Sequence, residues 1–157
     1  VEQAIEGREI EIAVLENSCY GKKPLCSIPG EIIPQHEFYS YEAKYLDENG
    51  ALLAIPAKLS QHEIEKIQDA AAKIFETLGC EGMSRIDFFL EKDTGQLFFN
   101  EANTIPGFTK ISMYPKLWEA THIPYQELLS RLIDLAIARH ERRKKMRKIS
   151  SHHQNLL

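Results

Sequence analysis

The sequence predicts an α+β fold, in which helices pack on a mainly antiparallel sheet. Runs typical of strands and apolar positions at helical spacing follow each other without a repeating strand–helix–strand order. Residues 84–91 and 96–101 are short apolar runs joined by Lys92–Gly95, the pattern of an antiparallel hairpin. A chain of 157 residues, of which 43% are hydrophobic, can build one domain with its own core.

The first part of the chain predicts strands and then a long loop. Residues 9–16 (EIEIAVLE) alternate polar and apolar side chains, which is the period of a half-buried strand. Residues 26–33 predict a second strand that bends at Pro29 and Gly30. Residues 35–53 follow neither period and end near an Asn-Gly turn signal. Because long loops in compact domains are uncommon without a role, we expect an ordered, functional loop here.

Helices are expected in the later part of the chain. Ser60 and Glu63 form the Ser-x-x-Glu pattern of a capping box, and apolar residues at helical spacing follow it up to Gly79. Residues 115–120 predict a short helix, and residues 125–143 predict a long final helix. Between the hairpin and the short helix, residues 103–113 contain Gly and Pro and predict a loop.

Composition argues against several classes of protein. No apolar run approaches the ~20 residues that a membrane span needs. The first ten residues lack a basic segment followed by an apolar one, so a secretion signal is not expected. The three cysteines have no Cys-x-x-Cys spacing, which argues against a disulfide framework and a zinc knuckle. We therefore expect reduced thiols and a cytoplasmic location.

A basic run near the end of the chain contrasts with the net charge of −4. Its members are Arg139, Arg142, Arg143, Lys144, Lys145, Arg147 and Lys148. Such a run can bind nucleic acid or anionic lipid, but this one follows a helix and has no interleaved aromatic residues. We interpret it as a solvated helix end, and we expect residues 141–157 to be a basic, flexible tail without a nucleic-acid or membrane partner.

Oxygen ligands are expected to converge at the hairpin. Asp87 lies in its first strand, whereas Glu101 and Asn103 lie two residues apart at the end of the second strand and face the same way. Carboxylate and amide oxygens suit Mg²⁺, which proteins commonly hold through one or two carboxylates and substrate phosphates. The alternative is that these side chains are simply solvated acidic residues near a hairpin.

Two further features near the hairpin suggest anion binding. Arg85 lies two residues before Asp87 and therefore on the same strand face, where it could meet a phosphate or an oxyanion, or pair with Glu101. In residues 105–109 (IPGFT), Gly107 permits close approach of backbone N–H groups to an anion. A single Pro-Gly pair has little specificity by itself.

Four motifs together resemble the D-alanine–D-alanine ligase family of ATP-grasp enzymes. They are EGREIEIAVL, FYSYEAKY, SRIDFFL and FFNEANTIPGFTKISMYPKLW, in this order, within roughly residues 1–140. The resemblance implies that residues 1–140 are the family's C-terminal ATP-grasp domain, with residues 37–55 as an omega-type loop. It also implies that the N-terminal and central domains are absent, and the abrupt start without Met indicates a fragment of a longer protein.

The resemblance assigns the metal and catalytic roles. It implies that Asp87, Glu101 and Asn103 bind two Mg²⁺ ions, or Mn²⁺ in their place, with Glu101 bridging the metals at the phosphates of ATP. Arg85 and the backbone N–H of Gly107 would stabilise the oxyanion of the tetrahedral intermediate.

It also assigns residues to the substrates. Ser112 would hold the carboxylate of the second D-alanine. Glu2 and Ile5 would meet the adenine, and Glu9 the ribose hydroxyls. Lys44 would contact the nucleotide phosphates, and Tyr45 would close over the active site and exclude water. A tyrosine at position 45 resembles the members that form a dipeptide, which favours D-alanine over D-lactate as second substrate.

The implied enzyme is an ATP-dependent ligase of cell-wall synthesis in bacteria. ATP would phosphorylate the carboxylate of one D-alanine, and the amine of a second would attack the acyl phosphate to form the dipeptide of peptidoglycan precursors. The partners implied are D-alanine, ATP, the N-terminal part of the same enzyme, and a second subunit in a homodimer. Because the other domains would supply part of the site, we expect this chain alone to be inactive. Another ATP-grasp carboxylate–amine ligase and a non-catalytic nucleotide-binding module are the alternatives.

Overall fold

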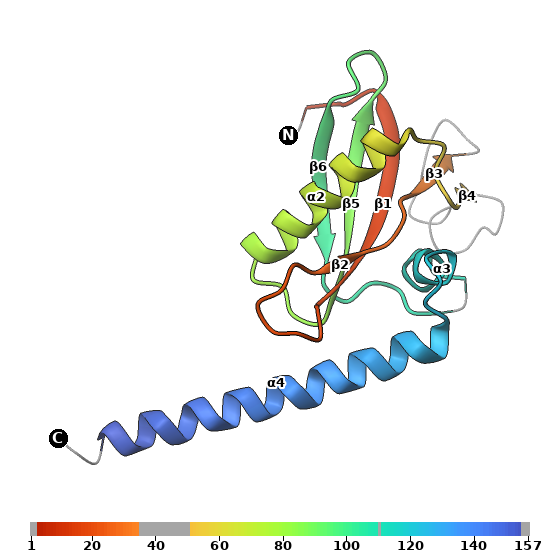
Figure 1. Cartoon of the computed structure of the whole chain (residues 1–157). Helices are drawn as coiled ribbons and strands as arrows, with labels where there is room; N and C mark the ends of the chain where they lie inside the picture. Colours follow the sequence, from red (N-terminus) through yellow and green to blue (C-terminus); the bar gives the residue numbers. More distant parts are fainter. Residues whose placement is uncertain (1–2, 35–50, 110, 155–157) are drawn as a thin grey trace.

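The computed structural model describes residues 3–34, 51–109 and 111–154, and it places helices on an antiparallel sheet (Figure 1). Within these residues the sheet has six strands in the order β4-β3-β1-β5-β6, with β2 paired to β1 off this path. The strands are β1 Gly7–Leu15, β2 Leu25–Cys26, β3 Gly30–Pro34, β4 Ala51–Ala54, β5 Met83–Glu91 and β6 Leu97–Asn103. The helices are α2 Gln61–Thr77, α3 Met113–Ala120 and α4 Tyr125–Gln154. This confirms the predicted α+β class.

One face of the sheet is covered by α2. Alternation along β1 sends Ile10, Ile12 and Val14 to this face, where they are buried with Ile86 and Phe88 of β5. The predicted capping box starts the helix, because the side chain of Ser60 accepts from the backbone N–H of Glu63 and the Glu63 carboxylate accepts from that of Ser60. The sequence-predicted strand, helix and hairpin therefore build one apolar layer.

Part of the opposite face is covered by α3 and α4. Ala13 and Leu15 of β1 point there and pack with Tyr114 and Trp118 of α3. The buried hydroxyl of Tyr114 donates to the backbone carbonyl of Val14 at 2.9 Å, which ties α3 to the central strand. Nearer the start of β1, the residues on this face are glutamates instead of core residues. This face of the sheet therefore has a region that is lined by polar instead of apolar side chains.

The second predicted strand bends where expected. It is interrupted before Gly30, so that residues 25–26 pair with β1 as β2 and residues 30–34 continue as β3. The predicted loop over residues 35–53 is wrong at its end, because residues 51–54 form strand β4 beside β3. Residues 35–50 lie outside the described part of the chain, so the omega-type loop stays a prediction for them.

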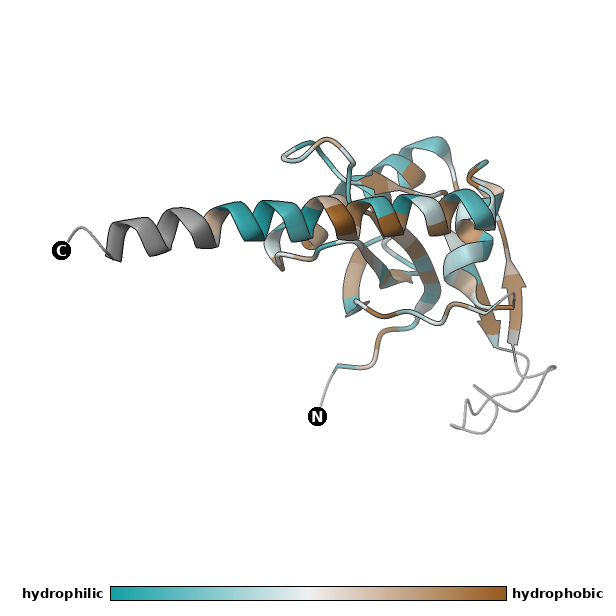
Figure 2. Cartoon of the chain, turned by 90° about the horizontal axis from the view of Figure 1, so that it is seen from below, coloured by the Kyte–Doolittle hydropathy of each residue, from teal (hydrophilic) through white to brown (hydrophobic). Residues whose placement is uncertain are grey.

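The final helix is longer than predicted. It continues to Gln154 instead of ending near residue 143, so residues 141–154, predicted as a flexible tail, are helical. Lysine and arginine are good helix formers, and no Gly or Pro interrupts this stretch. The described part of α4 that extends past the sheet is largely hydrophilic (Figure 2). None of the helices in the described residues is both long and apolar enough to cross a membrane.

Three arginines of α4 fasten it to loops of the domain. Arg139 and Arg143 pair with Glu81, with N–O distances of 3.1 and 2.9 Å. Arg142 pairs with Glu16 at 3.1 Å and lies over the ring of Tyr20, 4.5 Å from its centroid. This part of the basic run is thus engaged with the domain, which the interpretation as a solvated helix end did not anticipate.

Candidate functional site

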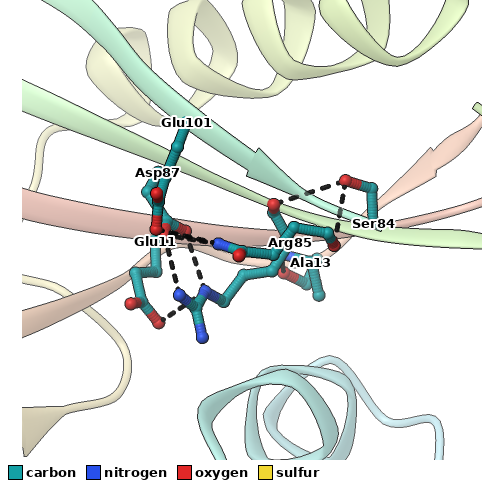
Figure 3. A network of polar contacts seen from close by, with 8 residues as sticks. Glu11, Ala13, Ser84, Arg85, Asp87 and Glu101 are labelled. Carbon is teal, nitrogen blue, oxygen red and sulfur yellow. Dashed lines mark hydrogen bonds and ion pairs between the residues drawn. The ribbon is translucent and has the colours of Figure 1, made fainter. Parts of the chain in front are cut away.

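Three carboxylates form a row across the polar face of the sheet (Figure 3). In the register of the strands, Glu11 of β1 lies opposite Asp87 of β5, and Asp87 lies opposite Glu101 of β6. Two residues further along the strands, on the same face, Arg85 lies opposite Asn103. Side chains of directly opposite residues share a face, so β-pairing alone gathers three acids, one amide and one guanidinium.

Arg85 is held between two of these carboxylates. Its Nε donates to Oδ1 of Asp87 at 2.8 Å, and its Nη2 donates to Oδ2 at 2.7 Å. The same Nε lies 3.2 Å from Oε2 of Glu11. Both acids are only 2% exposed, and the Arg85 side chain is 18% exposed. The ion-pair partners of Arg85 are therefore Asp87 and Glu11, and not Glu101, which the sequence suggests as an alternative.

Asn103 connects the remaining acids. Its amide nitrogen donates to Oδ2 of Asp87 and to Oε1 of Glu101, each at 3.1 Å. Because one amide group contacts both carboxylates, the side chains of Asp87, Glu101 and Asn103 converge on a single region. Glu101 is exposed and Asn103 half-buried, so this region opens to solvent on the β6 side.

Burial and neighbouring charges shift the pKa values of Asp87 and Arg85. Burial raises the pKa of Asp87, and the negative charge of Glu101 adds to this, although the Arg85 guanidinium acts in the opposite direction. Burial works against the charge of Arg85, but its hydrogen bonds with Asp87 and the nearby negative charge of Glu11 outweigh this and raise its pKa. The guanidinium is therefore permanently charged, and the acids around it form a site that favours an additional cation.

The donor set fits a hard divalent cation. Among the described residues, no group of three or more His, Cys, Asp or Glu side chains is arranged to hold a metal ion, and both oxygens of Asp87 are engaged by Arg85. The converging set consists of two carboxylates and one amide, which are the oxygen ligands that Mg²⁺ uses when phosphates complete its coordination. Half a turn of the Asn103 amide would present its oxygen in place of its nitrogen.

The loop after β6 curls around a serine. Oγ of Ser112 accepts from the backbone N–H of Thr109 at 3.0 Å and lies 2.8 Å from the Thr109 hydroxyl. A Cβ at Gly107 would lie 3.0 Å from the same Oγ, so a larger residue would crowd the turn. Phe108 packs on Tyr114 and Tyr125, with ring centroids 5.8 and 5.5 Å away. These contacts anchor a loop that starts directly at Asn103.

Ser112 also begins α3. It is the N-cap residue, but its side chain makes no capping hydrogen bond, because its Oγ is turned back to the loop. The first backbone N–H groups of a helix lack helical partners and carry partial positive charge. The start of α3 therefore combines a hydroxyl with N–H donors, which is a suitable arrangement for a carboxylate.

A comparison with known protein families shows which family the chain belongs to. A family model described as "D-ala D-ala ligase C-terminus" matches residues 1–134. The chain belongs to this family. The predicted resemblance and the predicted ATP-grasp C-terminal fold are thereby confirmed.

Individual members of the D-alanine–D-alanine ligase family match most of the chain. The D-alanine–D-alanine ligase of Shouchella clausii is 57% identical over 147 residues, which are 94% of this chain and 39% of that protein. The solved D-alanine–D-alanine ligase of Coxiella burnetii is 40% identical, with a TM-score of 0.83 over 98% of this chain and 38% of that one. The ligase of Bacillus anthracis, solved in complex with ATP, is 27% identical, with a TM-score of 0.70 over 90% of this chain and 43% of that one.

The chain thus spans about two fifths of the length of these ligases. The predicted nucleotide residues are only partly covered by the structure. Ile5 is half-buried just before β1. Glu9 is half-buried on the polar face, two residues before Glu11. Glu2, Lys44 and Tyr45 lie outside the described residues, so their roles stay predictions.

Sequence reasoning missed two members of the site in this D-alanine–D-alanine ligase domain. Glu11 was treated only as part of a strand pattern, although Glu9, Glu11 and Ala13 share a face by simple alternation. The missing information was the pairing of β1 with β5, which brings Glu11 opposite Asp87. Thr109, the partner of Ser112, was quoted in a motif without a role.

Proposed function

We propose that this chain is the C-terminal, ATP- and metal-binding part of a ligase that joins two D-alanines through an acyl phosphate. The main support is the convergence of Asp87, Glu101 and Asn103 beside a fixed guanidinium, in a domain of the D-alanine–D-alanine ligase family. The product would serve peptidoglycan precursor synthesis in the bacterial cytoplasm. The intact enzyme would be a homodimer.

Asp87, Glu101 and Asn103 would hold two Mg²⁺ ions, or Mn²⁺, with Glu101 shared between them. The ions would neutralise the negative charge of the ATP phosphates. The exposed position of Glu101 and the contacts of Asn103 with both acids support this assignment. The charge balance also supports it, since one guanidinium faces three carboxylates and a cation would reduce the repulsion between them.

Arg85 would stabilise the oxyanion of the tetrahedral intermediate, together with the backbone N–H of Gly107. A guanidinium that is pre-oriented by neighbouring carboxylates does not need to reorganise when charge develops on the substrate. The two bonds to Asp87 and the contact with Glu11 provide that orientation. The absence of a side chain at Gly107 leaves its N–H open to close approach.

Ser112 and the start of α3 would bind the carboxylate of the second D-alanine. The hydroxyl of Ser112 accepts a hydrogen bond from the Thr109 N–H, and when the Thr109 hydroxyl is the donor in the second contact, the Ser112 proton is left to donate to a substrate oxygen. Glu2 and Ile5 would contact the adenine, and Glu9 the ribose. Lys44 would contact the phosphates, whereas Tyr45 would exclude water from the acyl phosphate.

The 157 residues alone would bind MgATP weakly and would not turn over. The matched ligases are more than twice as long, and the remaining part of such an enzyme would supply the other half of the nucleotide cleft and the site for the first D-alanine. The decisive protein is therefore a chimaera in which this chain replaces the matching segment of the Shouchella clausii ligase, to which it is 57% identical.

ADP release by this chimaera with MgATP tests the proposal. We expect stimulation by D-alanine, less by D-serine or D-lactate, and none without acceptor. Glu101→Gln should abolish it, whereas Glu76→Gln, on an exposed position of α2, should not. Stimulation by a different amine acceptor only would favour another carboxylate–amine ligase. If a folded chimaera releases no ADP with any of the acceptors, the chain would be interpreted as a non-catalytic nucleotide-binding module.

A further inference from the structure

Glu11 is the one carboxylate of the row that the proposed metal set does not use. It lies in the middle of the sheet, between Asp87 on β5 and Gly30 on β3. Its side chain is 2% exposed. Burying a charge so completely costs free energy unless an opposite charge compensates it. Arg85, whose Nε lies 3.2 Å from Oε2 of Glu11, is a cation that provides such compensation.

Asp87 faces two competing demands. In this structure both of its oxygens accept hydrogen bonds from Arg85, at 2.8 and 2.7 Å. A carboxylate that coordinates a divalent cation gives up part of such a bidentate contact, because the cation takes at least one oxygen. Arg85 then needs a second partner if it is to stay charged and in place for the substrate. Glu11 is the other acid within reach, since its Oε2 lies 3.2 Å from the same Arg85 Nε that donates to Asp87 (Figure 3).

We propose that Glu11 is a positioning residue that holds the Arg85 guanidinium in place when Asp87 turns to the metal. The inference rests on the proposed function, in which Asp87 is a metal ligand and Arg85 faces the oxyanion. Glu11 and Asp87 are then alternative partners of one guanidinium. When Asp87 coordinates the metal, Arg85 keeps its ion pair with Glu11, and neither the guanidinium nor the Glu11 carboxylate becomes exposed to water.

The surroundings of Glu11 suit this role. Its backbone is paired on both sides, to β3 and β5, so the carboxylate starts from a fixed position. Gly30 beside it has no side chain, and a Cβ there would lie 2.9 Å from Cδ2 of Leu117, so α3 closes tightly on this flank. In such a water-poor environment the attraction between Glu11 and Arg85 is screened less than at the surface.

Hydrogen exchange of the Arg85 Nε–H, measured by NMR on the metal-free chain, tests the inference. The variants are Glu11→Gln, Asp87→Asn and the double variant. Each single variant leaves one carboxylate on Arg85, so its exchange should stay within several-fold of the unmodified chain. In the double variant the fold increase in the exchange rate should exceed the product of the fold increases in the two single variants. We expect an excess of roughly tenfold or more, because Arg85 loses both carboxylates that accept from it.

Additivity would overturn the inference. If the double variant exchanges no faster than Asp87→Asn alone, Glu11 does not hold Arg85. Glu31→Gln is the matched control, since Glu31 on β3 accepts two hydrogen bonds from Arg8 at 2.8 and 2.6 Å; it should change the exchange of Arg8 and leave Arg85 unchanged. Exchange in metal-free protein does not depend on catalysis. A failure of the ligase assay can therefore be distinguished from a failure of Glu11 to hold Arg85.

A second measurement covers the case in which the double variant does not fold. Mn²⁺ titration, followed by electron paramagnetic resonance, compares the single variants. Glu11→Gln should weaken Mn²⁺ binding by about tenfold, since Asp87 is then the only charged partner of Arg85 and is harder to recruit. Glu31→Gln should change it less than about twofold, as expected for a more distant charge. Equal Mn²⁺ affinity of the two variants would overturn the inference.

Discussion

Replacing Arg85 by methionine removes the cation from the carboxylate row and keeps a long side chain in its place. Two hydrogen bonds to Asp87 and one contact with Glu11 are lost, and two acids that are each 2% exposed remain opposite each other. Removing one partner of a buried ion pair costs about 3–5 kcal/mol, because the remaining charge is left uncompensated. We expect Arg85→Met to lower the free energy of unfolding by that amount near neutral pH.

The loss should shrink in acid. Burial already raises the pKa of Asp87, and removing the guanidinium raises it further. A carboxyl whose pKa is higher in the folded than in the unfolded chain stabilises the fold below its ordinary pKa and loses this contribution as the pH rises through the folded value. As the pH falls below neutrality, Asp87 of Arg85→Met should therefore take up a proton in the folded chain more readily than in the unfolded one, and the deficit should decrease.

Urea unfolding followed by tryptophan fluorescence measures this directly, because Trp118 is the single tryptophan and is 1% exposed. Arg8→Met is the matched control. Arg8 and Glu31 form a similar two-bond pair, but their side chains are 28% and 12% exposed, so the expected loss is about 1 kcal/mol. The reasoning fails if Arg85→Met costs no more than Arg8→Met, or if its deficit grows on acidification.

Three further predictions concern the scaffold, and urea unfolding measures each. Ser60→Ala should cost about 1 kcal/mol, since it removes the capping box of α2, and an unchanged midpoint would mean that the cap contributes nothing. Gly30→Val should cost roughly 1–3 kcal/mol, because its Cβ would lie 2.9 Å from Leu117; a more stable variant would show free space there. Tyr114→Phe should cost about 1–2 kcal/mol, because the hydrogen bond to the Val14 carbonyl is lost. Thr121→Ala serves for comparison, because it removes the hydrogen bond to the Leu117 carbonyl at the other end of α3.

Local pattern was enough for the elements whose apolar residues decide their packing. The alternation of residues 9–16, the capping box at Ser60 and the hairpin turn at Lys92–Gly95 all gave the observed elements. The pattern failed where no local signal exists. Strand β4 has four residues and, within the described part of the chain, pairs with β3 alone, so nothing in its own sequence separates it from a loop. The helix α4 lacks a stop signal, which left its end undefined.

The site was predictable in its members on β5 and β6 and not in its member on β1. Arg85 and Asp87 are two residues apart, so their shared face follows from the pleat. The position of Glu11 depends on a register between strands more than seventy residues apart, and the sequence does not specify that register. This is also why Glu101 was considered as the alternative ion-pair partner of Arg85, whereas the pairs with Asp87 and Glu11 were not.

An irregularity in the hairpin explains how its aromatic and acidic residues can serve different faces. Phe88 pairs with Phe99, but Asp87 pairs with Glu101, so Asn100 is an extra residue in β6. Without it, Phe99, Glu101 and Asn103 would all point the same way. With it, Phe99 packs edge-on against Phe88 on the α2 side, whereas Glu101 and Asn103 turn to the row that contains Asp87. One inserted residue therefore lets the same short strand complete the core and present ligands on the opposite face.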